Sequence, residues 1–170
     1  MESLAIQHLL TGSDEKLTIQ RLFQHSLTLK LVNRAAPHML LANRIVLYAV
    51  SHSCFYGSIF NHQRLSLGTA EQKRGFHKVL AEGLLISSRN NDIDVTLEIL
   101  CACCIFRCTH DIDSRILRMA LAKAMNSQSN DWSISPTGVA IESPSFFKVY
   151  HTTLVGSILG AVINEKKYTS

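Results

Sequence analysis

One long apolar stretch near the middle of the chain, residues 92–106, restricts the possible folds more than any other feature. In its first half, Ile93, Val95 and Leu97 alternate with the polar residues Asp94 and Thr96, which is the period of a half-buried β-strand. From residue 100 onward both sides of such a strand are apolar, so both of its faces should be covered there. The sequence therefore predicts a strand that ends near the centre of the fold.

Shorter patterns add further elements around this strand. Residues 26–30 alternate between apolar and polar side chains and predict a second strand. Residues 37–51 and 113–125 carry apolar side chains at helical spacing and predict two helices. The expected fold class is therefore α+β, with a mixed or antiparallel sheet packed against two main helices in a single domain.

Three segments are less sharply defined. Residues 76–88 fit either a strand or a helix, and a strand is preferred. A closing hairpin is predicted from Trp132 to Ile141, around the turn at Pro136 and Gly138. Residues 146–163 are apolar but fit a strand and a helix equally. The predicted divisions are an N-terminal arm over residues 1–19, a core over residues 20–143 and an apolar C-terminal extension over residues 144–170.

The five cysteines point to packing rather than to metal binding. They are Cys54, Cys101, Cys103, Cys104 and Cys108. No signal peptide pattern opens the sequence, so the thiols are expected to stay reduced in an intracellular compartment. Cys101 and Cys103 would lie on one face of the predicted strand and Cys104 on the other, an arrangement unlike a zinc site. Because reduced cysteine behaves as a small buried hydrophobe, core packing is predicted, with no metal and no cofactor.

No complete catalytic motif accompanies the chain's eight histidines. His52 with Cys54 is a candidate nucleophile pair, but no neighbouring motif supplies an oxyanion hole. Asp92, Asp94 and Glu98 are expected on the polar face of the central strand, solvated or paired with basic side chains. The protein is therefore predicted not to be an enzyme and to have no small-molecule substrate.

Basic side chains carry the functional prediction. The formal net charge is +4, from 17 basic and 13 acidic residues. The excess lies in the first half of the chain, and such clusters attract phosphate backbones and anionic lipids. The predicted anion-binding or nucleocapsid-binding residues are Arg64, Lys73, Arg74, Lys78, Arg89, Arg115, Arg118 and Lys123.

The order of these elements resembles that of a rhabdovirus matrix protein, of the short kind found in plant-infecting members. The residues that carry the resemblance are 22–31, the segment 48–52, the step Phe55-Tyr56-Gly57, residues 94–99, the predicted helix over 113–125 and Trp132. The resemblance covers about residues 20–141. This chain has only three prolines and lacks the proline-rich budding motif of the animal-virus members.

The resemblance implies a viral structural protein located in the virion interior and in the host cytoplasm or nucleus. Its implied partners are other copies of itself in an open-ended oligomer, the viral nucleocapsid or RNA, and the inner face of an anionic membrane. The alternative reading is a small intracellular RNA-binding or host-interaction protein that acts as a monomer or dimer. Sedimentation separates the two readings, because only the first predicts open-ended association.

Overall fold

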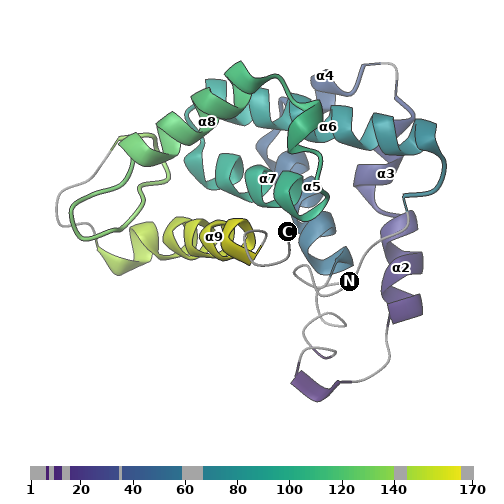
Figure 1. Ribbon diagram of the computed structural model, residues 1–170, viewed down its shortest axis with the longest axis horizontal. Helices are drawn as coiled ribbons and strands as arrows, with labels where there is room; N and C mark the ends of the chain where they lie inside the picture. Colours follow the sequence, from purple (N-terminus) through teal and green to yellow (C-terminus); the bar gives the residue numbers. More distant parts are fainter. Residues whose placement is uncertain are drawn as a thin grey trace.

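The computed structural model describes residues 7, 10–12, 16–34, 36–58, 67–139 and 145–165. Within these residues every regular element is a helix, and the only β-type pairing is an isolated bridge between Gln128 and Ile134. The predicted α+β fold class is therefore wrong, and the protein is a helical single domain (Figure 1).

The named helices of the described residues follow one another along the chain. In order they are α2 (Lys16–Gln24), α3 (Leu27–Val32), α4 (His38–Leu41), α5 (Arg44–Gly57), α6 (Ala70–Arg89), α7 (Ile93–Ile105), η1 (Thr109–Asp111), α8 (Ser114–Asn126) and α9 (Phe146–Glu165) within the described residues. The helix predicted over residues 113–125 is confirmed as α8, whereas the single helix predicted over residues 37–51 is divided into α4 and the start of α5, with Asn43 capping the second helix.

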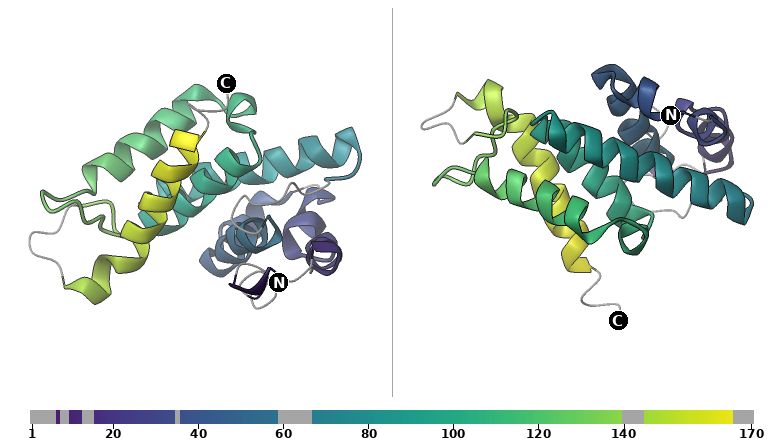
Figure 2. Two further views of the ribbon diagram at one scale, coloured as in Figure 1. Left: turned by 60° about the horizontal axis from the view of Figure 1, so that its bottom comes forward. Right: turned by 90° about the horizontal axis from the view of Figure 1, so that it is seen from above.

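The central element is α7, and it is a helix where a strand was predicted. Twelve of its thirteen residues are buried, because α5, α6, α8 and α9 all pack against it (Figures 1 and 2). A helix that is surrounded on all sides has no polar stripe, so its sequence lacks the 3.6-residue contrast that marks a surface helix. Asp92 begins α7 by accepting a hydrogen bond from the backbone N of Val95, as an N-cap residue does.

The other predicted strands are helical for local reasons. Ser26 caps α3 instead of opening a strand, since its hydroxyl accepts a hydrogen bond from the backbone N of Leu29. Thr69 and Gln72 form a capping box that starts α6, which contains the whole of residues 76–88. The predicted hairpin is a turn rather than a pair of strands, and Ile141 lies outside the described residues.

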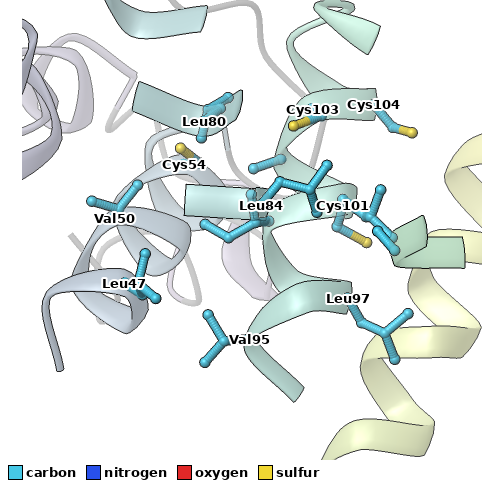
Figure 3. Close-up of a cluster of buried hydrophobic side chains, with 14 of the residues drawn as sticks. Leu47, Val50, Cys54, Leu80, Leu84, Val95, Leu97, Cys101, Cys103 and Cys104 are labelled. Carbon is cyan, nitrogen blue, oxygen red and sulfur yellow. The ribbon is translucent and has the colours of Figure 1, made fainter. Parts of the chain in front are cut away.

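The C-terminal segment forms α9, which packs along α7 and contributes to the core. Val155, Leu159 and Val162 are buried there. Figure 3 shows the α7 side of this core, where Leu97 points towards α9. No helix among the described residues has the length and apolar character needed to span a bilayer. Most of the predicted arm, residues 1–19, lies outside the described residues.

Candidate functional site

Two acidic side chains of α7 lie in the interior of the helical domain. Asp94 is 6% exposed and Glu98 is 1% exposed, and they occupy positions four residues apart on the same helix face. The prediction placed Asp92, Asp94 and Glu98 on the polar face of a strand, solvated or paired with basic side chains. The strand is wrong, and Asp94 and Glu98 are buried rather than solvated, but Asp94 does lie 3.7 Å from the guanidinium of Arg44. A buried carboxylate is costly unless it is hydrogen-bonded or paired, so the partners of these two residues decide what the site can do.

Asp94 accepts hydrogen bonds from three side chains on two other helices. Thr152 Oγ1 of α9 donates to Asp94 Oδ1 at 2.9 Å, and His151 Nδ1 lies 2.8 Å from the same oxygen. Tyr48 of α5 donates its hydroxyl proton to Asp94 Oδ2. Burial alone would raise the pKa of Asp94, but the hydrogen bonds from Tyr48, His151 and Thr152 outweigh it and lower the pKa below its ordinary value. Asp94 is thus an ionised carboxylate inside the domain.

Glu98 lies one helical turn further along and has its own partners. Ser51 of α5 donates a hydrogen bond to Glu98 Oε2. The other oxygen, Oε1, lies 3.3 Å from His52 Nε2 and 3.7 Å from His151 Nε2. The two histidines come from opposite flanks of α7, one from α5 and one from α9, so Glu98 lies at the point where three helices meet.

We call His52, Glu98 and His151 the His–Glu–His site. One ligand atom from each residue, an imidazole nitrogen or a carboxylate oxygen, lies within 4.8 Å of the other two. The two histidine side chains are 40% and 42% exposed, whereas Glu98 is buried beneath them. The site therefore has a buried carboxyl group as its floor and two imidazoles that are accessible to solvent.

The local sequence explains why α5 supplies so much of this site. Asn43 caps α5 by accepting a hydrogen bond from the backbone N of Ile45. The side chains of Arg44, Tyr48, Ser51 and His52 then follow at helical spacing on the face towards α7. Arg44 closes the row at the outer end: its Nε lies 2.5 Å from Asp92 Oδ2, and its guanidinium lies 4.7 Å from the centre of the Tyr48 ring.

The predicted basic residues do not form one surface. Lys73, Arg74 and Lys78 are exposed on the first half of α6, whereas Arg89 ends that helix, roughly 16 Å beyond Lys78 along its axis at 1.5 Å per residue. Lys78 lies 3.7 Å from Glu82, in an ion pair.

Two of the three predicted basic residues on α8 are already paired with other groups of the protein. Arg115 pairs with Asp113 at 2.7 Å, and Arg118 is exposed. Lys123 donates hydrogen bonds to the carbonyl oxygen of Ser88 and to Asn91 Oδ1 and joins the end of α8 to the end of α6. Arg64 lies outside the described residues.

All five cysteines are buried and reduced. Cys101, Cys103 and Cys104 lie on α7, and Cys54 faces that helix from α5 (Figure 3). Burial raises the pKa of the Cys54 thiol well above its ordinary value and raises that of Cys101 to about 12. His52 turns to Glu98 while Cys54 lies in the core, so the candidate pair of these two residues is not assembled as a nucleophile and base.

Sequence reasoning missed the His–Glu–His site. The available signal was the pair Asp94 and Glu98, spaced i, i+4 within an otherwise apolar run, which fits one face of a buried helix. Nothing in the sequence linked that pair to His52 or His151, which come from distant segments.

The fold and the site together define a class of helical domain. Its central helix carries a pair of carboxylate side chains, and two histidines from other helices lie above them. The chain belongs to the family described as a domain of unknown function (DUF6895), whose model matches residues 21–161. That match includes all three residues of the His–Glu–His site. Neither the curated proteins nor the solved structures gave a match to the chain.

Proposed function

We propose that the protein binds one divalent transition-metal ion, with zinc as the reference ion, at the His–Glu–His site. The ligand atoms would be His52 Nε2, His151 Nε2 and Glu98 Oε1. Two imidazoles and one carboxylate are a ligand set that zinc takes in catalytic sites. Imidazole also suits copper, nickel and iron, so the ligand types favour transition metals over calcium or magnesium.

The distances support this ligand set. Bonds of about 2.0–2.1 Å in a tetrahedral shell put ligand atoms roughly 3.3 Å apart. The two histidine nitrogens lie 3.3 Å and 3.7 Å from Glu98 Oε1. The third pair, the two imidazoles, lies within 4.8 Å, so rotation of the partly exposed histidine side chains would have to bring them closer around an ion.

The observation that carries the proposal is the double role of His151. Its Nδ1 lies 2.8 Å from the ionised carboxylate of Asp94, and its Nε2 faces Glu98. A proton on Nδ1, donated to Asp94, leaves the Nε2 lone pair directed at the metal position. Carboxylate partners of this kind fix the tautomer of metal-ligating histidines and raise their basicity. Ser51, bound to the other oxygen of Glu98, orients the carboxylate ligand in the same way.

Three protein ligands leave a coordination position open to solvent. Catalytic zinc sites keep such a position for water, whereas structural sites fill all four positions with protein atoms. A water molecule bound there would become acidic enough to supply hydroxide near neutral pH. The proposal is therefore a site suited to metal-assisted hydrolysis, and it departs from the sequence-based prediction of a protein without metal or catalysis.

Isothermal titration calorimetry of the full chain with Zn²⁺ tests the proposal. The expected result is one ion per chain, with affinity falling at least about tenfold in His52→Gln, in His151→Gln and in Glu98→Gln. His110→Gln is the matched control, because His110 is exposed and lies outside the site. Circular dichroism establishes that each variant is folded. Zinc affinity that is absent in the parent, or unchanged in the folded double variant His52→Gln/His151→Gln, would refute the proposal.

Assembly with other macromolecules, as a matrix-type protein or as an RNA-binding accessory protein, remains a second proposal. It is supported by the exposed side chains of Lys73, Arg74 and Lys78 on one end of α6. Changing all three to Ala should weaken binding to RNA or anionic liposomes and flatten its salt dependence, with little change in stability. Equal binding by parent and triple variant across a salt series would exclude this surface.

A further inference from the structure

An aromatic groove lies at the start of α9, on the same turn of that helix as His151 but lined by other side chains. Its walls include Trp132 from the turn before α9 and Phe146, Tyr150 and Leu154 from α9 itself. The groove has a volume of about 620 Å³, within the range of small-ligand pockets. Trp132 is 76% exposed and Phe146 is 70% exposed, which is unusual for side chains of this size.

The aromatic rings are held in position by their surroundings. Phe146 and Tyr150 are stacked, with ring centres 5.3 Å apart and an angle of 19° between the planes. Trp132 has a φ of 68°, a left-handed conformation that is strained for a bulky residue. Hydrogen bonds from Ser129 and Ser133 to the carboxylate of Asp131 brace the turn that carries it.

The charge of the groove selects among ligands. Asp131 is the single charged side chain among the described residues of its lining. Hydrogen bonds, first from Ser129 and then from Ser133, lower the pKa of Asp131 to about 2, so this side chain is negatively charged at neutral pH. The faces of aromatic rings are also electron-rich and attract cations.

We propose that this aromatic groove binds a small organic ammonium cation, of the quaternary or alkylammonium kind. Trp132, Phe146 and Tyr150 would surround the apolar substituents of the cation, and Asp131 would balance its charge. An anionic ligand would meet the carboxylate and the electron-rich rings with the wrong sign. A neutral apolar ligand would gain the contact area but leave the charge of Asp131 uncompensated, which makes it the informative comparison.

The experiment uses the fluorescence of Trp132, which is the only tryptophan in the chain. The full chain is titrated with choline and, in parallel, with 3,3-dimethylbutan-1-ol, which has the same shape without the charge. Saturable quenching by choline at concentrations at least about tenfold lower than by the alcohol is expected, as cation–π and carboxylate contacts imply. Equal half-saturation by the two compounds, or no saturable response to choline, overturns the proposal.

Two variants of the groove and one control variant test whether the response comes from the groove. Asp131→Asn should weaken choline binding severalfold and leave the response to the alcohol unchanged, while Asp113→Asn on α8 should alter neither. Tyr150→Leu should weaken choline binding with the groove still apolar. Unchanged choline binding in both Asp131→Asn and Tyr150→Leu would also overturn the proposal.

Discussion

His151 Nδ1 lies 2.8 Å from Asp94 Oδ1, so an imidazole of α9 and a buried carboxylate of α7 form a direct pair between two helices. The neighbouring Thr152 donates a hydrogen bond to the same oxygen. A carboxylate that is 6% exposed has little access to water, so it depends on these donors for its solvation. Docking of α9 and completion of the polar site are consequently one structural event.

The first prediction concerns Asp94 as a positioning residue for His151. Asp94→Asn keeps the size of the side chain but removes the charge that favours a proton on His151 Nδ1. Zinc affinity should fall by about 10- to 100-fold, the usual effect of losing a partner of a metal-bound histidine. Asp92→Asn is the matched control, because Asp92 contacts Arg44 and not the histidines. Calorimetry measures both variants, and an Asp94→Asn affinity equal to the parent's would contradict the positioning role.

The second prediction compares two glycines in helices. At Gly160 of α9 an added Cβ meets nothing within 4 Å, so Gly160→Ala should stabilise the protein by about 0.5–1 kcal/mol through the lower flexibility of the unfolded chain. At Gly75 of α6 the added Cβ would lie 2.6 Å from Val32 Cγ1 and 3.2 Å from the Val32 carbonyl oxygen. Gly75→Ala should therefore destabilise the protein by about 1–3 kcal/mol, because α3 must move away.

Urea denaturation measures both glycine variants. If Gly75→Ala matched the parent in its free energy of unfolding, the contact between α3 and α6 would be looser than the structure has it. If Gly160→Ala lowered the free energy of unfolding, position 160 would not have the open space beside it that the structure shows.

The helices and the site differ in how far the sequence could predict them. α8 was predicted correctly because it lies on the surface: Ala120 and Ala124 are buried while Arg118 is exposed, and this contrast appears as helical periodicity. α7 has no such contrast because neighbours cover all of its faces. Its β-branched residues Ile93 and Val95 then favour a strand locally, a preference that the packing of four helices overrides.

The candidate site could not be predicted for a different reason. In the sequence, Glu98 is one acidic residue among thirteen. It becomes a candidate ligand only beside His52 and His151, and the packing of α5 and α9 is what brings these histidines to it. The cysteines of α7, by contrast, were correctly predicted to be buried, although they were placed on a strand. Whether a side chain is buried depends more on its apolar character than on whether a helix or a strand carries it.

A third prediction follows from the burial of the thiols. With a pKa of about 12, Cys101 is a thiolate in only about one molecule in ten thousand at pH 8, and thiolate is the reactive form. Ellman's reagent should therefore react slowly with the native protein, at a rate limited by opening of the domain. All five cysteines should react at once in guanidinium chloride. Rapid labelling of Cys101 or Cys103 in the native protein, located by mass spectrometry, would contradict the observed packing.

The fourth prediction is a dependence of stability on acid pH through Asp113, the N-cap of α8. Hydrogen bonds from the side chain and backbone of Arg115 lower the pKa of Asp113 to about 2, below the ordinary value of about 3.9. A depressed pKa means that this contribution to stability is fully present above about pH 4 and is lost as the pH falls towards 2.

Thermal denaturation between pH 2 and 5 checks this dependence. Asp113→Asn should keep most of the stability at neutral pH, because Asn also caps helices well, but should lose part of the acid dependence. High salt should reduce the effect in the parent, since the pair with Arg115 is exposed. An identical pH profile for parent and variant would rule out a contribution from Asp113.

The enclosure of α7 also has a consequence for synthesis on the ribosome. α7 is made before α8 and α9, so for a time the nascent chain contains its most apolar helix without two of the helices that cover it. Leu97 and Cys101 then lack the surface of α9, and Asp94 lacks its donors His151 and Thr152. Exposed apolar helices of this kind are prone to aggregate and are typical clients of chaperones. Emergence and packing of the α9 segment should therefore be the step that completes the cover of α7.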